Sequence, residues 1–497
     1  SEPASLDPHK VESDVEFNIV SDLFDGLVAV KLDGSIEPRL AQAWENKDNT
    51  VWVFHLRPNA TWSDGTAITA KDFVWSWQRL VDPKTASPYA SYPGNMHIQN
   101  AREIALGEKP LDTLGVKAVD DNTLEIRLTQ PNAAFLAMLA HPSMVPVDKI
   151  LISRFAEKWT KPEHIVTSGP YKLSEWVVNE KIIAQRNTRY WNNKATVINT
   201  VTYLPISSET ADVNRYKAGE IDITNTIPVN QFAQLKASVG SQVSVLPLLS
   251  TYYYELNTTK APFNDARVRR ALNMALDKDI IAEKVMGQGQ RPAWLISQPE
   301  IGGVTLKAPD YASWPREKRI EEAKKLLNEA GYNDAHPLSF NLLYNTMETH
   351  QRLAIAVSSM WKKNLGVEAK LQNQEWKTML DTMHTGNFDA VRYAWIADYD
   401  DAVTFLNNFR TGDSENTSKY SNPAYDEVLH NAAKAKDVAE RGRYYQQAED
   451  KLAQDVPAIP LYHYVRTHLV KPWVGGFEPD RLGRFYTKDL YIKKHEG

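Results

Sequence analysis

The sequence contains no cysteine among its 497 residues. Disulfide bonds, thiolate metal sites and cysteine nucleophiles are therefore excluded, and we expect no lipid-modified N-terminal cysteine. Long apolar runs are missing as well, because the longest, residues 133–140, is far shorter than the roughly 20 residues that cross a bilayer. The first residues also lack the basic start and apolar stretch of a signal peptide, so we expect that any such segment has been removed or never existed.

Neither sign of charge dominates the sequence. Lys and Arg number 57 and Asp and Glu number 62, which gives a net charge of −5. This balance offers no basic footprint for nucleic acid, so we expect no nucleic-acid partner.

The common sequence motifs of enzymes are also missing. We find no His-Glu-x-x-His, no phosphate-binding loop, no Gly-x-Gly-x-x-Gly after a strand and no Gly-x-Ser-x-Gly. The 12 histidines are scattered, and His463 and His468 are spaced poorly for a shared metal site on a helix. We therefore expect neither a metal nor another cofactor.

What the sequence does contain is typical of a folded protein with more than one lobe. Its length exceeds that of one ordinary domain, and 42% hydrophobic and 24% charged residues are normal for a globular chain. The 14 tryptophans exceed what a core usually uses and favour an aromatic surface that faces a ligand. Core packing remains the explanation for most of them.

The first part of the chain is predicted to be an α+β unit. Alternating apolar residues over 51–57, followed by the turn Asp64-Gly65, predict a hairpin. Thr69 can cap a helix that ends before Asp82-Pro83. A second hairpin pattern covers residues 114–128.

From about Thr251 the pattern changes to strands that alternate with long amphipathic helices, which is typical of an α/β lobe. One βαβ unit is predicted from a strand at 338–343, a helix at 349–364 and a strand at 369–371. The other predicted elements are a helix with Ser313 as cap and Gly331 as stop, a helix over 438–453 capped by Asp437, and a strand over 458–465.

Long stretches of the chain resemble one known family. The run 44–79, with Trp62-Ser63-Asp64-Gly65-Thr66 and Thr69-Ala70-Lys71-Asp72-Phe73, resembles the signature block of peptide-binding proteins that serve ABC importers. Further segments are similar to members of this family, so the resemblance covers essentially the whole chain. These segments are residues 5–9, 22–27, 82–89, 190–193, 252–255, 374–378 and 470–476.

The resemblance implies an α/β fold of the periplasmic-binding-protein type. Two α/β lobes are expected to close on a hinge around an extended peptide, with an additional α+β lobe beside them. The expected boundaries are 1–24, 149–249 and 466–497 for a discontinuous lobe I, 25–148 for the extra lobe II, and 250–465 for lobe III. Family members usually have further residues before the segment 5–9, so we expect this chain to be truncated or unusually processed.

The resemblance also implies the ligand contacts. Residues 388–399 resemble the family's ligand strand and loop, in which Asp398 would hold the ligand's α-ammonium group and Arg392 would help to meet its carboxylate. A buried charge needs a fixed counter-charge, and a guanidinium suits a bidentate contact with a carboxylate. Judged without the family, the better explanation of Asp398 is an ordinary loop residue, and the alternative for Arg392 is a surface ion pair.

His350 has a case of its own, because it lies in the first turn of a predicted helix. A cationic side chain opposes the helix dipole there unless an anion is bound. A solvated histidine is the alternative interpretation. By resemblance, four aromatic residues would line the groove, although aromatic residues are more often part of a core. These are Tyr89, Tyr254, Trp376 and Trp395, and the resemblance adds Glu12, Asp14 and Ala394 to the ligand-binding set.

Two groups of substitutions distinguish this chain from the family pattern. Met286 and Met383 stand where the family has a lysine and an arginine for the ligand carboxylate, while Asp14, Asp400 and Asp401 add negative charge at the amine end. We therefore expect ligands of a narrower length range, or ligands with cationic or modified groups.

Taken together, the residues and the family resemblance imply a soluble, non-catalytic, monomeric receptor in the periplasm of a Gram-negative type of cell. It would bind an extended oligopeptide and deliver it to the permease subunits of an ABC importer. A receptor for a murein tripeptide or a cationic or modified peptide is the first alternative. More distant alternatives are a sugar- or nickel-binding member of the importer class and a glycoside hydrolase that uses Asp398 and Asp400.

Overall fold

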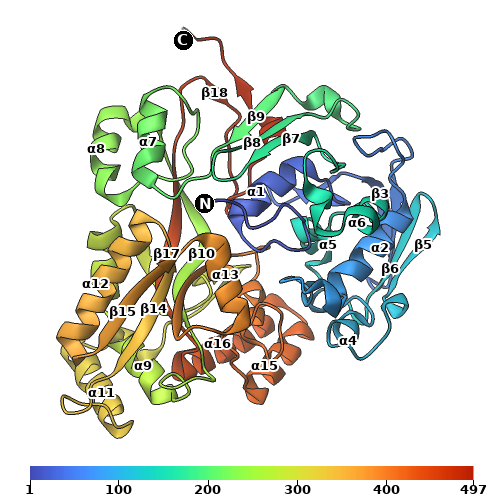
Figure 1. Ribbon diagram of the computed structural model, residues 1–497. Coiled ribbons are helices and arrows are strands. Elements are labelled where there is room, and N and C mark those ends of the chain that lie inside the picture. Colours follow the sequence, from blue (N-terminus) through green and yellow to red (C-terminus); the bar gives the residue numbers. More distant parts are fainter. Residues whose placement is uncertain (496–497) are drawn as a thin grey trace. The chain divides into compact units, whose positions relative to one another are not determined.

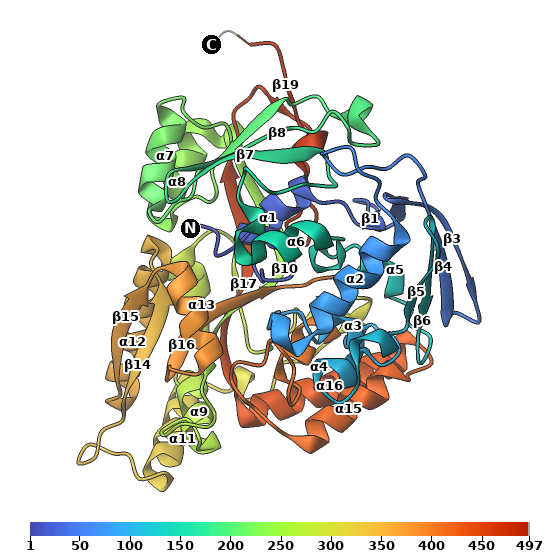
Figure 2. The same ribbon diagram turned by 45° about the vertical axis from the view of Figure 1, so that its right-hand side comes forward.

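The computed structural model describes residues 1–495, and the chain divides into two compact units. Unit 1 comprises Ser1–Pro205, Trp473–Asp480 and the residues from Arg484 onward, and unit 2 comprises Ile206–Pro472 and Arg481–Gly483. The chain therefore returns to unit 1 near its C-terminal end, apart from Arg481–Gly483 (Figures 1 and 2). The finer division into three lobes stays a prediction.

A four-stranded antiparallel sheet with the order β3-β4-β6-β5 forms one part of unit 1. Its strands are β3 (Ala41–Lys47), β4 (Val51–Leu56), β5 (Val116–Asp120) and β6 (Thr123–Arg127). The hairpin predicted within residues 114–128 is thus confirmed, because β5 and β6 pair directly.

The hairpin that contains β4 is not the one predicted from the turn at Asp64-Gly65. β4 follows β3 through a tight turn in which Asp48 and Asn49 both have positive φ, 57° and 56°, as a type I′ hairpin requires. Asp64-Gly65 closes a separate small turn, in which the Trp62 N–H donates to the Thr66 carbonyl at 2.8 Å. A tight-turn dipeptide shows where the chain reverses but not which strands it joins.

Helix α2 (Ala70–Val81) forms as its sequence predicts. Thr69 and Asp72 make a reciprocal capping box, and the helix ends at the residue before Asp82-Pro83. Its inner face is fully buried, and the Trp77 indole N–H donates to the Met144 carbonyl at 3.0 Å. A local cap and an apolar stripe are sufficient to define this helix.

The rest of unit 1 contains a second antiparallel sheet, two small strand pairs and five more helices. The sheet consists of β7 (Tyr171–Val177), β8 (Lys181–Arg186) and β9 (Thr200–Tyr203), and the pairs are β1 (Val28–Val30) with β2 (Ile36–Pro38) and β18 (Val474–Gly475) with β19 (Tyr491–Ile492). The helices are α1 (Asp14–Leu23), α3 (Tyr92–Asn95), α4 (Ala101–Ala105), α5 (Phe135–Leu139) and α6 (Lys149–Phe155).

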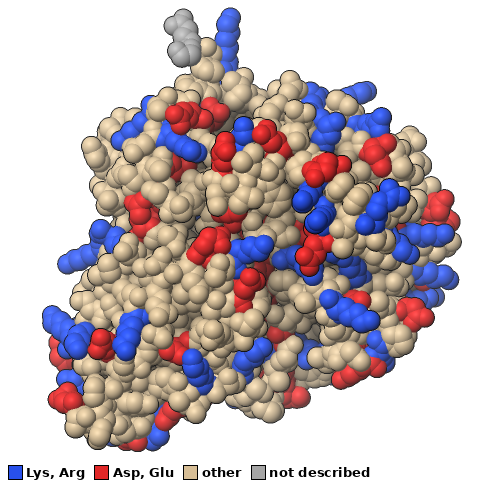
Figure 3. Space-filling view, in the orientation of Figure 1, with Lys and Arg blue, Asp and Glu red and all other residues tan. Residues whose placement is uncertain are grey.

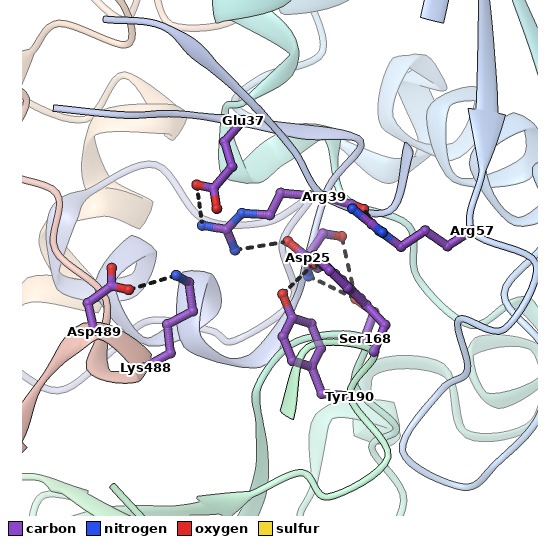
Figure 4. Close-up of polar contacts among 9 residues, drawn as sticks. Asp25, Glu37, Arg39, Arg57, Ser168, Tyr190, Lys488 and Asp489 are labelled. Atoms are coloured by element: carbon purple, nitrogen blue, oxygen red, sulfur yellow. Dashed lines mark hydrogen bonds and ion pairs between the residues drawn. The ribbon is translucent and has the colours of Figure 1, made fainter. Parts of the chain in front are cut away.

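Unit 1 contains a buried ion pair between Arg39 and Asp25 (Figure 4). The Arg39 guanidinium points at the Asp25 carboxylate, with 3.5 Å between Nη1 and Oδ1, and both side chains are buried. The same carboxylate accepts hydrogen bonds from the Tyr190 hydroxyl at 2.8 Å and the Trp191 indole at 3.0 Å. Both charges of this pair are therefore compensated inside the protein.

Unit 2 is built on a six-stranded mixed sheet with the order β11-β17-β10-β16-β14-β15. Its strands are β10 (Val243–Leu256), β11 (Arg291–Pro292), β14 (Ser339–Asn345), β15 (Glu368–Gln374), β16 (Ala390–Ile396) and β17 (Ala458–Leu469). β14 runs parallel to both β15 and β16, whereas β10 is antiparallel to β16 and β17. The predicted βαβ unit and the predicted strand over 458–465 are both confirmed.

The helices of unit 2 largely follow the sequence predictions. α12 (Glu348–Leu365) ends at Gly366, whose φ of 67° suits glycine, and Asp437 caps α16 (Val438–Asp455) with its side chain. α11 (Arg316–Glu329) starts later than expected, because Ser313 hydrogen-bonds to Asp310 in a preceding short turn instead of capping it. The others are α7 (Glu209–Lys217), α8 (Val229–Val239), α9 (Ala266–Met274), α10 (Lys278–Ile280), α13 (Trp376–Thr385), α14 (Val403–Leu406) and α15 (Pro423–Ala433).

Unit 2 has two separate apolar clusters. The larger lies between the sheet and helices α9, α11 and α12, and the smaller gathers α7, α8 and the end of β17. Paired carboxylates join the helices of the two clusters: Glu209 of α7 accepts the Thr349 N–H at 2.9 Å, and Glu348 of α12 accepts the Thr210 hydroxyl at 2.6 Å. Each helix N-terminus is thus capped partly by an acid from the other helix.

The surface has mixed charge on the face that Figure 3 shows, where basic and acidic side chains are interspersed. Across residues 1–495, no helix is both long and apolar enough to cross a membrane.

Candidate functional site

The register of β10 and β16 decides which candidate residues share a face of the unit 2 sheet. Tyr254 lies opposite Arg392, and Tyr252 lies opposite Ala394. Because side chains alternate along a strand, these four residues belong to one face. α12 covers this face, since its His350 contacts the Tyr252 ring. The structure thus places Arg392, Tyr254 and Ala394 on one face of the sheet with His350 against it, and their assignment to a ligand site stays a prediction.

Arg392 is buried among tyrosines on this face, with only 7% of the residue exposed. Its Nη1 donates to Asn345 Oδ1 at 3.1 Å, its Nη2 donates to the Tyr464 hydroxyl at 2.6 Å, and its charge lies 4.6 Å from the centre of the Tyr252 ring. Its Nε–H is buried without a hydrogen-bond acceptor within residues 1–495. Burial opposes the charge, but the pKa of Arg392 is raised overall by the surrounding phenols of Tyr464 and Tyr252.

The charge of Arg392 has no carboxylate partner in the described part of the chain, because its polar contacts are an amide oxygen and phenols. Arg39 in unit 1 is the contrasting case, since it is equally buried but pairs with Asp25 (Figure 4). A buried cation without an anion carries a desolvation cost that no carboxylate within residues 1–495 offsets. The arrangement around Arg392 is therefore suited to receive an anion.

His350 lies beside this cation as a neutral group. Its Nδ1 is 3.0 Å from the Tyr252 hydroxyl, and burial, followed by the nearby Arg392 charge, lowers its pKa well below the usual value. The solvated histidine considered from the sequence does not match this position, because only 9% of the residue is exposed. A bound anion would raise the pKa of the imidazole and so oppose the effect of the Arg392 charge.

The tryptophans predicted for the site lie on the opposite face of the sheet. Trp376 of α13 stacks on Tyr393 with their rings 6.4 Å apart, and Tyr393 alternates with Arg392 along β16. Trp395 shares the face of Tyr393. The sheet itself thus separates Trp376 and Trp395 from Arg392 and His350.

Asp398 follows β16 in the loop that leads into α14, and it is also buried. Its backbone N–H donates to the Thr404 hydroxyl at 3.0 Å, and its Oδ2 lies 3.5 Å from the same oxygen. The Trp395 indole N–H donates to this hydroxyl as well, at 3.2 Å. Asp398 and Trp395 are therefore parts of one small cluster centred on Thr404.

The other two aspartates of this loop have basic partners. Asp400 accepts the Gly302 N–H at 3.0 Å and lies 3.6 Å from Arg481, and Asp401 lies 3.7 Å from Arg441. The extra negative charge expected from Asp400 and Asp401 is thus partly compensated within unit 2.

Three predicted site residues belong to unit 1. Tyr89 is buried and stacks on His141 with a ring separation of 4.5 Å. Glu12 is buried just before α1, and Asp14 is the first residue of that helix. Their assignment to the ligand site stays a prediction.

The two methionines at the expected basic positions are both buried. Met286 belongs to the larger apolar cluster, together with Tyr252 and Tyr254, and Met383 lies on the buried side of α13. The sequence prediction did not include Asn345, Tyr464 or Thr404. No local sequence pattern marks these three residues. Strand pairing brings Asn345 and Tyr464 to Arg392, and the short helix α14 brings Thr404 to Asp398.

Within residues 1–495, no group of three or more His, Cys, Asp or Glu side chains is arranged to hold a metal ion. The polar chemistry of the described site consists of a buried guanidinium, a neutral imidazole, phenols and the Asp398 carboxylate. These groups can bind charged ends of a small molecule.

Comparisons with known proteins agree with this architecture. The periplasmic oligopeptide-binding protein OppA of Salmonella typhimurium is 53% identical over 497 residues, which cover 100% of this chain and 92% of that protein. The periplasmic murein peptide-binding protein MppA of Escherichia coli is 45% identical, with 99% and 92% covered. The crystal structure of Haemophilus influenzae OppA in complex with RPPGFSPFR aligns with a TM-score of 0.97 at 44% identity and covers 99% of this chain and 98% of that one.

The family model described as bacterial extracellular solute-binding proteins, family 5 Middle, matches residues 35–417. This range includes the buried Arg392, His350 and Asp398 of unit 2 as well as most of unit 1. The fold of the periplasmic-binding-protein type, expected from the sequence, is confirmed by these similarities. The chain belongs to the bacterial extracellular solute-binding proteins of family 5.

Proposed function

We propose that this protein is the receptor of an ABC peptide importer and binds a short peptide by its two charged ends. The observation that carries the proposal is the buried Arg392 charge, which has tyrosine and asparagine contacts and no carboxylate partner within residues 1–495. A ligand carboxylate would supply the missing anion, and a guanidinium binds carboxylates with two parallel hydrogen bonds.

Asp398 is proposed to receive the ligand's ammonium group. It lies six residues after Arg392 along β16 and the following loop, and six residues of extended chain span at most about 20 Å. The two groups therefore lie no farther apart along the chain than the length of an extended peptide of about six residues. A free peptide carries a cation at one end and an anion at the other, which complements Asp398 and Arg392.

The relatives extend this proposal to location and partners. The Salmonella and Escherichia relatives are named as periplasmic proteins that bind oligopeptides and murein peptides. We therefore place this receptor in the periplasm, as a monomer that closes on its peptide and passes it to membrane permease subunits. Groups that hold the two ends of a ligand support a binding role without catalysis.

The test compares trialanine with trialanine amide by titration calorimetry, first with the wild-type protein and then with Arg392→Met. The wild-type protein should bind the free acid at least tenfold more tightly, because loss of a charged hydrogen-bonded partner usually costs about 1.5 kcal/mol or more. Arg392→Met should bind both peptides equally. Equal binding of acid and amide by the wild-type protein would reject the proposed role of Arg392.

A more specialised peptide ligand, such as a murein tripeptide or a cationic or modified peptide, is favoured by one observation. Met286 and Met383 are buried and uncharged, so Arg392 alone among these three positions can meet a carboxylate. A receptor with one fixed cation should prefer one ligand length. Calorimetry with tri-, tetra- and pentaalanine would measure this length preference, and equal affinity for all three peptides would exclude a narrow length range. Native mass spectrometry of the purified protein would identify any retained ligand directly.

The glycoside hydrolase alternative is less well supported. It needs Asp398 and Asp400 as a catalytic pair, but Asp400 is held by the Gly302 N–H and Arg481. Turnover of chromogenic glycosides would revive this alternative.

A further inference from the structure

Thr404 lies in the short helix α14 and is 4% exposed. Its hydroxyl oxygen is the meeting point of three groups: the Trp395 indole nitrogen at 3.2 Å, the Asp398 backbone nitrogen at 3.0 Å and the Asp398 carboxylate at 3.5 Å. This one hydroxyl therefore joins the end of β16 to the loop that follows it.

The chemistry of these neighbours determines how the hydroxyl is oriented. An indole N–H and a backbone N–H can only donate, so the Thr404 oxygen must accept both hydrogen bonds. Its own hydrogen is then left to be donated, and the Asp398 Oδ2 lies in reach as an acceptor. The hydroxyl thus has a single arrangement that satisfies all three groups.

The rest of the loop is held by other contacts. The Asp400 carboxylate accepts the Gly302 N–H, and the Asp401 carboxylate accepts the Val403 N–H, both at 3.0 Å. These contacts hold residues 400–403, which precede Thr404, and neither of them involves the Asp398 side chain. The orientation of the Asp398 carboxylate relative to Trp395 is thus set where Thr404 contacts both.

We infer that Thr404 is a positioning residue that orients the Asp398 carboxylate toward a ligand's ammonium group and holds Trp395 beside it. This inference rests on the proposed function of Asp398. A hydroxyl that donates to the Asp398 Oδ2 fixes the direction of one of the two carboxylate oxygens. Thr404 itself need not touch the ligand.

The test measures binding of trialanine and N-acetyl-trialanine to the wild-type protein, Thr404→Val and Thr404→Ser. The wild-type protein should prefer the free amine. Thr404→Val keeps the shape of the side chain but removes the hydroxyl, and it should lower the affinity for trialanine about tenfold while leaving that for the acetylated peptide nearly unchanged. Thr404→Ser keeps the hydroxyl and should restore the preference.

The ratio of the two affinities separates positioning from stability, because a general loss of folded protein would weaken both peptides alike. Thr129→Val is the matched control, since its hydroxyl is exposed in unit 1 and donates a long hydrogen bond of 3.4 Å to the His97 carbonyl. If the wild-type protein does not distinguish the two peptides, the proposed role of Asp398 fails. If it does, and Thr404→Val distinguishes them equally well, the inference about Thr404 alone is wrong.

Discussion

Replacing Arg392 with methionine should leave the ligand-free protein about as stable as before. The change removes two hydrogen bonds, to Asn345 and Tyr464, which together contribute roughly 1–3 kcal/mol. It also removes a buried charge that has no carboxylate partner within residues 1–495, and relief of such a charge is worth several kcal/mol. We therefore expect the free energy of unfolding to stay within about 1 kcal/mol of the wild-type value or to rise.

Arg39→Met is the matched comparison, because Arg39 is buried to a similar extent but pairs with Asp25. This change leaves the Asp25 carboxylate buried with only the Tyr190 and Trp191 hydrogen bonds. Breaking a buried pair by removing one partner typically costs about 3–5 kcal/mol. The two variants make the same chemical change and should differ by roughly 3 kcal/mol or more.

Urea unfolding would measure both free energies, after refolding from denaturant has removed any retained ligand. Circular dichroism and tryptophan fluorescence should be followed together, because only coincident transitions justify one free energy for a protein with two units. Adding trialanine should then stabilise the wild-type protein and not Arg392→Met. Equal destabilisation by the two substitutions would refute the view that Arg392 lacks a counter-charge in the free protein.

The remaining predictions concern stability in unit 2. Glu449 accepts hydrogen bonds from the backbone N–H groups of Ile296 and Ser297, and burial raises its pKa to about 7. Its contribution to stability should therefore be complete below about pH 4.5 and should be lost as the pH rises through 7. Between pH 4 and 8 the free energy of unfolding of the wild-type protein should fall by up to about 3 kcal/mol. Glu449→Gln should remove this pH dependence, and an unchanged pH dependence in that variant would contradict the assignment. Glu348→Ala should cost about 1–2 kcal/mol because the Ser208 and Thr210 hydroxyls lose their acceptor. Glu368→Ala, at an exposed glutamate in β15, is the control and should change stability by less than about 0.5 kcal/mol. Equal effects of Glu348→Ala and Glu368→Ala would argue against a contribution from the α7–α12 contact.

The sequence alone determined the elements whose signals are local. The capping box Thr69–Asp72 and the apolar face of α2 lie within a few turns of each other, and the βαβ unit around α12 is written in consecutive segments. Asp398 and Arg392 could be proposed because residues 388–399 resemble the ligand strand and loop of a known family. The helix and strand signals depend on backbone geometry over a few residues and need no knowledge of the rest of the chain.

Only the tertiary structure decided which of these residues meet. Strand register places Tyr254 opposite Arg392 and sends Trp395 to the other face, and β17 brings Tyr464 to the guanidinium from 72 residues away in sequence. The turn at Asp64-Gly65 likewise could not reveal that β4 pairs with β3. A shift of one residue in pairing moves every side chain to the opposite face, and pairing is chosen by the packing of the whole sheet rather than by any local stretch. Because pairing decides which side chains surround Arg392, only the folded structure shows that this charge has no carboxylate partner within residues 1–495.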